Sequence, residues 1–156
     1  MTVVERSIEF SAPAERVWAV IGDVPAAAAC LPGLSLGAAL DERSFAARIS
    51  VSVGLLSLLY AGRLTVEEID HERRRVAFGF EGVALGGLTL AVRISAQVSA
   101  DGESASRLAI VNDIGLDVAT TMLAGPMIAP TGALLLDGFA RNIRQLVERA
   151  AAPPAP

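Results

Sequence analysis

The chain has 156 residues, of which 53% are hydrophobic and 19% charged, and this is the size and composition of one compact domain. The net charge is −4 and all thirteen basic side chains are arginine, which leaves little positive charge for nucleic acid. One cysteine and one histidine exclude an internal disulfide and a zinc site. We therefore expect a single domain over residues 1–150, a disordered Ala/Pro tail at 151–156, and neither a metal nor a nucleic-acid site.

The N-terminus and the scarce reactive residues favour a cytoplasmic protein. Glu5 and Glu9 interrupt the region where a signal peptide needs an apolar run. A free thiol suits a reducing compartment, and Cys30 fits a small buried side chain better than a reactive one. His71 lies in the charged string DHERRR, which is typical of a solvated turn rather than a catalytic cleft.

An N-terminal strand is followed by two short helices. Ser11 or Ala12 is expected to cap the first helix, whose first turn holds Pro13 and which ends at residues 22–23. A second short helix is expected over residues 25–30, before a Pro-Gly turn.

Alternation of apolar and polar residues predicts the strands that come next. In residues 88–99 the even positions are apolar, whereas the odd positions include Arg93 and Gln97. The same pattern recurs over residues 45–53, 58–66, 76–80 and 108–118. Because short turns join these segments, we expect an antiparallel meander with one dry face.

Helical periodicity returns near the C-terminus. Leu135, Phe139 and Ile143 share one face, and Arg141 and Glu148 lie on the other. A proline inside a helix costs about 3 kcal/mol, so the two prolines in residues 125–130 predict a kink or a loop before this helix. The helix, of about twenty residues, must cover the dry face of the sheet, because nothing else in the chain can.

Three motifs and their order carry a family resemblance. They are Asp23 with residues 30–33 (Cys-Leu-Pro-Gly), residues 53–54 (Val-Gly) with 60–62 (Tyr-Ala-Gly), and residues 137–143 (Asp-Gly-Phe-Ala-Arg-Asn-Ile). With these motifs the chain resembles the carbon monoxide dehydrogenase G-subunit family, within the START/polyketide-cyclase (SRPBCC) superfamily, over residues 3–150. The resemblance implies an α+β helix-grip fold: a curved antiparallel sheet of about seven strands wrapped around a long C-terminal helix, with two short helices after the first strand and a cavity between sheet and helix.

The resemblance also implies an accessory role. Proteins of this kind are cytoplasmic and peripheral to the membrane, and they serve a molybdenum-containing carbon monoxide dehydrogenase or a related hydroxylase. A quinone or a similar apolar ligand is the implied cargo, and no covalently attached cofactor is implied.

Inward-facing positions of the predicted strands and helix give the walls of such a cavity. The predicted ligand-binding residues are Tyr60, Phe78, Phe80, Leu90, Val92, Asn112, Ile114, Met122, Met127, Leu135 and Phe139. Asn112 is polar in this apolar set, and its amide either bonds Tyr60 or nearby backbone, or orients a carbonyl group of a ligand. Arg6 and Glu68 also occupy inward-facing positions of their strands, but they lie near strand ends and are interpreted as residues at the rim of the cavity. No catalytic residue is expected, because so few inward positions can act as an acid or a base.

A run of leucines marks a predicted hairpin tip. It consists of Leu55, Leu56, Leu58 and Leu59. Residues at both odd and even positions are apolar here, so the side chains on one face of the tip cannot pack against the core of their own sheet. These leucines either contact the glycine-rich corner at residues 82–87 or form a membrane or partner surface.

The sequence therefore favours a non-catalytic carrier or accessory protein that binds an apolar ligand, either a quinone or a lipid. The expected partners are a hydrophobic small molecule, a molybdenum hydroxylase and the inner membrane surface. The alternative is a small cyclase or dehydratase-type enzyme that acts on a hydrophobic substrate in the same cavity. A third hypothesis is a protein-interaction module whose cavity is filled by its own side chains.

Overall fold

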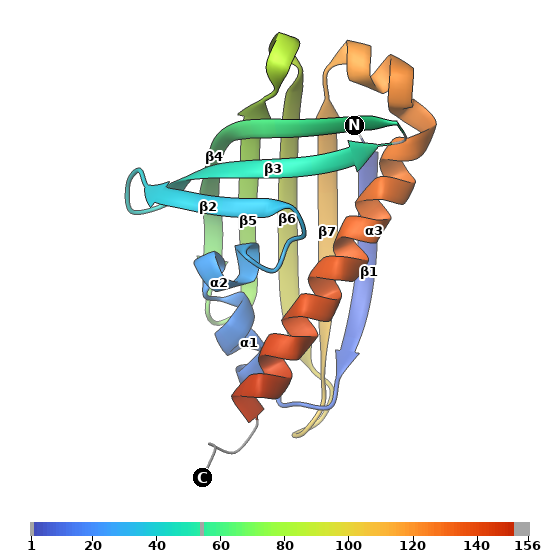
Figure 1. The fold of residues 1–156 in the computed structure, drawn as a ribbon. Helices are drawn as coiled ribbons and strands as arrows, with labels where there is room; N and C mark the ends of the chain where they lie inside the picture. Colours follow the sequence, from blue (N-terminus) through green and yellow to red (C-terminus); the bar gives the residue numbers. More distant parts are fainter. Residues whose placement is uncertain (1, 54, 152–156) are drawn as a thin grey trace.

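A computed structural model describes residues 2–53 and 55–151. These residues form a seven-stranded antiparallel sheet, two short helices after the first strand and one long C-terminal helix (Figure 1). The strand order is β1-β7-β6-β5-β4-β3-β2, so β1 and β2 are the two edges. The strands are β1 (Thr2–Phe10), β2 (Leu34–Ala39), β3 (Ser44–Val53), β4 (Leu56–Asp70), β5 (Arg75–Val83), β6 (Thr89–Ala100) and β7 (Ser106–Leu116). This is the predicted helix-grip arrangement, and the number of strands and the two short helices are confirmed.

The two short helices begin and end close to the predicted positions. α1 (Ala14–Ile21) starts after Pro13, which is itself the capping residue and makes no side-chain cap hydrogen bond, so the predicted cap at Ser11 or Ala12 is wrong. α2 (Val24–Ala28) is shorter than expected and begins one residue earlier. Each helix buries one apolar face, and Val17 and Ile21 on α1 are completely buried.

The predicted alternation of the strands is confirmed over most of its length. On β6, Leu90, Ile94 and Val98 are buried, whereas Arg93 and Gln97 are exposed. The exception lies after β7, which ends at Leu116 instead of continuing inward to Val118. Val118 is the first residue of the long helix and is 75% exposed.

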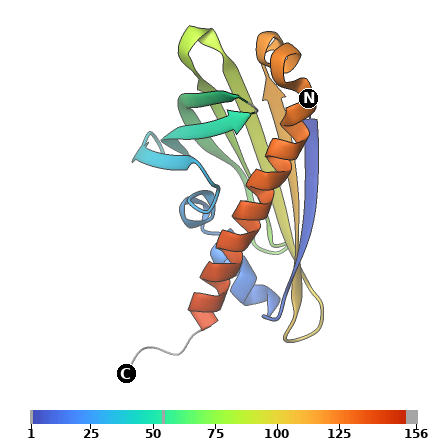
Figure 2. The ribbon, with the colours of Figure 1, turned by 45° about the vertical axis from the view of Figure 1, so that its right-hand side comes forward.

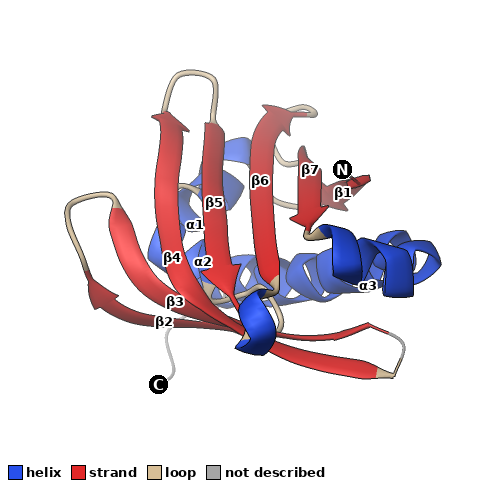
Figure 3. Ribbon diagram, turned by 90° about the horizontal axis from the view of Figure 1, so that it is seen from above, coloured by secondary structure: helices blue, strands red, loops and turns tan. Residues whose placement is uncertain are grey.

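A pair of glycines permits the sheet to curve. Gly62 on β4 lies opposite Gly82 on β5, and a Cβ atom at Gly62 would overlap the carbonyl oxygen of Glu81. No other residue type fits this close approach of two backbones. β4 turns sharply along its length, and the sheet wraps partly around the long helix (Figures 1 and 3).

The long helix α3 (Val118–Ala151) has 34 residues and would measure about 51 Å if straight. The sequence predicts only about twenty residues, because Pro126 and Pro130 were expected to interrupt it. Both prolines lie inside the helix, whose first turns are set at an angle to the rest (Figure 1). The predicted kink is therefore present and the predicted loop is not. Asp117 supports this early start, since its carboxylate accepts hydrogen bonds from the backbone N–H and the hydroxyl of Thr120.

The rest of α3 crosses the concave face of the sheet diagonally (Figure 2). Two of the sequence motifs meet where it is anchored. Asn142 donates a 2.7 Å hydrogen bond from Nδ2 to the carbonyl oxygen of Cys30, in the loop between α2 and β2. A Cβ atom at Gly138 would lie 2.6 Å from the ring of Pro32 in the same loop. These contacts give the motifs at residues 30–33 and 137–143 a structural role, which is to fix α3 against the sheet.

We expect Gly138→Val to lower the free energy of unfolding by about 2 kcal/mol, because the new side chain must displace the rigid ring of Pro32. Gly125→Val is the matched control on the same helix, since nothing lies within 4 Å of a Cβ atom there. The control should stay within about 0.5 kcal/mol of the wild type. Urea unfolding with an unchanged m-value measures both, and equal effects of the two substitutions would contradict the role given to the contact at Pro32.

Candidate functional site

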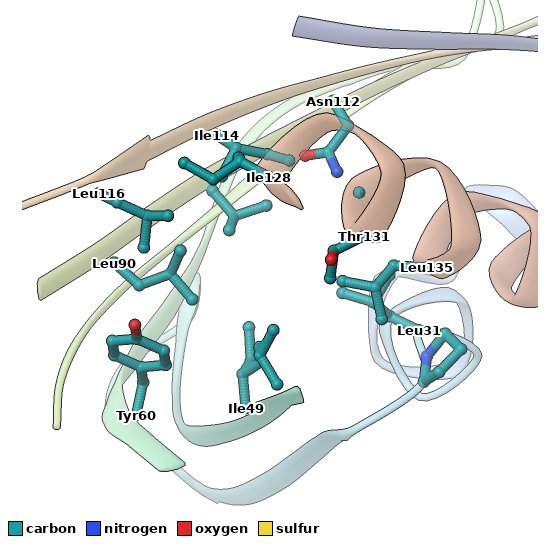
Figure 4. Close-up of a pocket in the computed structure, with 14 residues that line it drawn as sticks. Leu31, Ile49, Tyr60, Leu90, Asn112, Ile114, Leu116, Ile128, Thr131 and Leu135 are labelled. Carbon is teal, nitrogen blue, oxygen red and sulfur yellow. The ribbon is translucent and has the colours of Figure 1, made fainter. Parts of the chain in front are cut away.

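A small cavity lies between the concave face of the sheet and the middle of α3 (Figure 4). Its volume is about 50 Å³. The lining residues come from the loop after α2, from β3, β4, β6 and β7, and from α3. They are Leu31, Pro32, Ile49, Val51, Tyr60, Leu90, Val92, Asn112, Ile114, Leu116, Ile128, Thr131, Gly132 and Leu135. None of these fourteen side chains carries a charge, so the site suits a neutral, largely apolar ligand.

Six of the eleven residues predicted from the sequence line this cavity: Tyr60, Leu90, Val92, Asn112, Ile114 and Leu135. Phe78, Phe80 and Phe139 have the predicted inward direction, but they are buried in the packed core and do not line the cavity. Met122 and Met127 are 81% and 45% exposed, because the first turns of α3 extend beyond the sheet. The prediction that Phe78, Phe80 and Phe139 lie on the cavity wall is therefore wrong, whereas Met122 and Met127 lie in the kinked first part of α3, where the sequence placed them.

Sequence reasoning missed a group of lining residues on α3, namely Ile128, Thr131 and Gly132. The helix was expected to be interrupted at this point, so no face was assigned to it. Ile128, Thr131 and Leu135 recur at helical spacing across Pro130, and this periodicity could have identified them. Leu31 and Pro32 belong to a loop, for which periodicity gives no direction.

The cavity is narrower than the alanine-rich sequence suggests. A volume of 50 Å³ holds on the order of four water molecules, and it is too small for an aromatic ring with a tail. A ligand of that size requires α3 or the lining side chains to move apart. The first turns of α3 have few buried residues, and Ala124 and Ile128 are the two buried hydrophobic residues before Gly132. This part of α3 is therefore the part that can move at the smallest cost in buried surface.

Asn112 lies on β7 with apolar residues around it. Its backbone pairs with Val4 on one side and Ile94 on the other, and Ile110 and Ile114 flank it on the same face. The side chain is 2% exposed, and its Oδ1 atom is buried without a hydrogen-bond partner among the described residues. The structural alternative, in which Tyr60 or nearby backbone satisfies this oxygen, is therefore not realised. Figure 4 shows the amide directed into the cavity.

Tyr60 is the one titratable residue among the fourteen that line the cavity. It is 1% exposed, and burial raises the pKa of its phenol, with a smaller contribution from the negative charge of Asp117. The backbone N–H of Thr120 holds the pKa of Asp117 below its usual value, so that charge persists. Tyr60 is therefore a neutral hydroxyl at physiological pH and a poor proton acceptor.

The raised pKa predicts how Tyr60 titrates. It is the single tyrosine of the chain, so tyrosinate absorbance reports on it alone. We expect a midpoint above pH 10 in the folded protein and close to pH 10 in urea. Since the unfolded state then loses its proton first, the free energy of unfolding should fall as the pH rises above about 10, and Tyr60→Phe should remove this part of the decline. A folded midpoint at or below the midpoint in urea would contradict the burial of the hydroxyl.

The other reactive or charged residues from the sequence lie outside the cavity. Arg6 pairs with Asp137 on α3 at 3.0 Å, and Glu68 pairs with Arg75 on β5 at 3.1 Å. Both pairs are partly exposed, and neither Arg6 nor Glu68 lines the cavity.

The single histidine and the single cysteine have structural partners. Trp18 on α1 donates a 3.2 Å hydrogen bond from its indole to Nδ1 of His71, in the exposed turn between β4 and β5. The thiol of Cys30 is buried against the carbonyl oxygen of Ala26, and burial raises its pKa, which makes it less reactive.

Exposed apolar side chains gather at one end of the molecule, which Figure 3 views from above. Three segments lie at this end: the β3–β4 tip, the β5–β6 connection and the first turns of α3 (Figure 1). We call this the apolar end. Its exposed hydrophobic side chains are Leu55, Leu59, Val83, Leu85, Val118, Met122, Leu123 and Met127. Leu55 is fully exposed and Leu85 is 95% exposed, so the glycine-rich corner does not cover the leucine tip.

Two members of the leucine tip differ from this description. Leu58 is half-buried against the core, and the side chain of Leu56 lies outside the described residues. Helix α3 also contains a window, within Val118–Arg149, that is long and apolar enough to cross a membrane, with 22% of it buried in the fold. Core helices of globular domains can be equally long and apolar. The second half of α3 is such a core helix, because its Leu136, Phe139 and Ile143 are buried against the sheet.

Comparison with known proteins gives the family. Residues 7–148 match the family of CoxG, the G subunit of carbon monoxide dehydrogenase. The chain belongs to the CoxG family. The matched region contains all fourteen residues that line the cavity, as well as the contacts of Asn142 and Gly138 that fix α3.

Solved structures share the CoxG-family fold at low sequence identity. A conserved protein from Geobacillus kaustophilus is 16% identical, with a TM-score of 0.80 over 96% of this chain and 97% of that one. The ZhuI aromatase/cyclase from Streptomyces sp. R1128 is 17% identical, with a TM-score of 0.67 over 97% and 96%. A START superfamily protein from Mycobacterium smegmatis is 16% identical, with a TM-score of 0.63 over 95% and 98%. No curated protein sequence matches this chain significantly. These neighbours establish a START-type helix-grip fold.

Proposed function

We propose that this CoxG-family protein is a carrier that holds a neutral apolar ligand between its sheet and α3. The uncharged cavity lining is the observation that carries the proposal. Each Å² of apolar surface that leaves water contributes about 25 cal/mol to the free energy of binding. A ligand that widens the cavity is therefore bound through the apolar surface that it buries rather than through ion pairs. Costs of association and of moving α3 reduce this gain, and the ligand exchanges readily.

The partner in this proposal is a redox enzyme. Family membership supports a carbon monoxide dehydrogenase as the partner. We propose that this partner is a molybdenum-containing carbon monoxide dehydrogenase or a related hydroxylase, and that the ligand is a quinone or a lipid. A quinone ring is flat, neutral and mostly apolar, which suits walls such as Ile49, Leu90 and Ile114. Transfer between enzyme and membrane would then be the purpose of the carrier.

The enzymatic alternative has less support from the lining residues. The ZhuI neighbour is an aromatase/cyclase, and likeness at 17% identity extends to the fold only. A cyclase or dehydratase needs a group that exchanges protons near neutral pH. The fourteen lining residues contain no carboxylate, histidine, lysine or cysteine, and the phenol of Tyr60 is held neutral.

The apolar end supports a location at the membrane surface. Residues 118–136 of α3, residues 49–62 around the β3–β4 tip and residues 82–92 around the β5–β6 connection contain no charged side chain. An uncharged surface with protruding leucines suits the interfacial region of a bilayer. Ile49, Leu90 and Ile128 of these same segments line the cavity, so a ligand could pass between bilayer and cavity with little exposure to water.

Ligand binding is tested on the protein as purified from its cells. We expect mass spectrometry of an organic extract to detect a quinone or another neutral lipid, and an added quinone to raise the melting temperature. Val92→Phe places a ring in the cavity and should reduce both signals at least tenfold, whereas Ala91→Phe, on the exposed face of the same strand, should leave them unchanged. An empty extract together with no thermal shift would refute the carrier.

Membrane attachment is tested by sedimentation with phosphatidylcholine vesicles. The double variant Met122→Glu/Leu123→Glu should bind at least tenfold less than the wild type, because two charges would have to enter the interface. Ile69→Glu is the control, since Ile69 is 39% exposed at the other end of β4. Binding should not increase with anionic lipid, because the apolar end has no cations. Binding that appears only with anionic vesicles, or that survives the double substitution, would contradict the proposed surface.

A further inference from the structure

The first part of α3 contributes to the cavity wall with one face and carries exposed apolar side chains on the other. Thr120, Ala124 and Ile128 are buried and recur every four residues, and Ile128 lines the cavity. Met122 and Leu123 are largely exposed at the apolar end. An outward displacement of this segment therefore moves both faces together and removes part of the cavity wall.

This segment is attached to the sheet at both of its ends. Before its first residue, the backbone N–H of Thr89 on β6 donates a 3.0 Å hydrogen bond to Oδ1 of Asp117. At the other end, the backbone of Gly132 lies directly on the sheet, since a Cβ atom there would be 2.6 Å from Cδ1 of Ile114 on β7 and 3.2 Å from Cγ2 of Val4 on β1. Residues 118–131 thus connect two fixed points, and we call them the strap (Figure 1).

Two prolines weaken the strap between these points. Pro126 and Pro130 have no backbone N–H, so the carbonyl groups of Met122 and Pro126 lose the helical hydrogen bond that each would otherwise accept. A helix bends most easily where such bonds are missing. Beyond Gly132 the helix contains no further proline and Leu136 is completely buried, so bending is confined to the strap.

Water keeps the strap closed. Opening transfers Ala124, Ile128 and the apolar cavity wall from the protein interior into the solvent, which the hydrophobic effect opposes in water. A bilayer removes this opposition, because its acyl chains are as apolar as the core that these side chains leave. Residues 118–136 contain no charged side chain that would resist entry. Lipid therefore interacts more favourably with the open form than with the closed form, as a conformational change driven by binding requires.

We propose that membrane contact opens the cavity. At the bilayer surface the strap moves outward, Ile128 leaves the cavity wall and the apolar ligand exchanges with the lipid, whereas in water the strap stays closed. The proposal rests on the carrier function and the membrane surface proposed above, and it adds the coupling between them. It also states when a ligand can pass walls that leave a space of only 50 Å³ between them.

Transfer of Nile red, a neutral apolar dye, tests this coupling. Protein loaded with the dye is mixed with phosphatidylcholine vesicles that contain a lipid-attached quencher, so the fluorescence falls as the dye leaves the protein. If contact opens the strap, a tenfold increase in vesicle concentration should raise the transfer rate about tenfold, because each transfer requires a collision. Release through water would instead give a rate that does not depend on the vesicles.

The double variant Pro126→Ala/Pro130→Ala tests the part played by the prolines. It restores two backbone N–H groups to the strap, so opening must break additional hydrogen bonds, and transfer should be roughly fivefold slower at equal vesicle binding. Gly125→Ala is the matched control within the strap, since it adds no donor and nothing lies within 4 Å of its Cβ atom. The control should transfer the dye at the wild-type rate.

Three results separate this proposal from those on which it rests. A wild-type rate that does not depend on vesicle concentration would overturn the opening by membrane contact, and this measurement needs no variant to fold. A proline variant that binds vesicles and transfers the dye as fast as the wild type would overturn the role of the strap. Failure of the protein to take up the dye at all would instead count against the carrier function itself, and failure to sediment with vesicles would count against the membrane surface.

Discussion

One long helix, with the short helix α1 beside it against β6 and β7, has to cover the concave face of a seven-stranded sheet, and most features of this protein follow from that requirement. The face is wider than one helix, so the sheet must curve toward α3, and the glycine pair Gly62 and Gly82 permits this curvature. The helix is held at one place by Gly138 against Pro32 and by Asn142 on the Cys30 carbonyl. Where the sheet diverges from α3, a cavity of 50 Å³ is left between them.

The two halves of α3 serve different purposes. The second half packs on the sheet through Leu136, Phe139 and Ile143, and its burial stabilises the domain. The first turns, which contain both prolines, extend past the sheet and expose Met122 and Leu123. Because these first turns bury few side chains, they are the part of α3 that can move at the smallest cost in buried surface when a ligand enters.

The cavity offers few groups that can react or titrate, and its walls are mostly apolar. Its lining residues include one titratable group, the neutral phenol of Tyr60, and one orphaned amide oxygen at Asn112. Such a lining suits a neutral ligand that is held by apolar contact rather than by ion pairs. The neighbouring apolar end adds an uncharged surface on the same segments of β3, β6 and α3 that supply Ile49, Leu90 and Ile128 to the cavity.

The sequence alone determined six of the seven strands, the dry face and the family, because period-two alternation and the spacing of short motifs are local properties of the chain; β2 was assigned no residues. It also identified Tyr60, Leu90 and Asn112 as inward-facing. Tertiary structure decided which inward residues line the cavity and which are packed: Phe78 and Phe139 share the predicted direction with Tyr60, yet they meet other side chains instead of open space. The alternation along a strand shows which side chains point to the same face of the sheet. The path of α3 across that face depends instead on contacts between residues more than 100 positions apart, such as Cys30 and Asn142. The continuation of α3 through Pro126 and Pro130 has the same origin, since the Asp117 cap and packing on the sheet outweigh the local cost of two prolines.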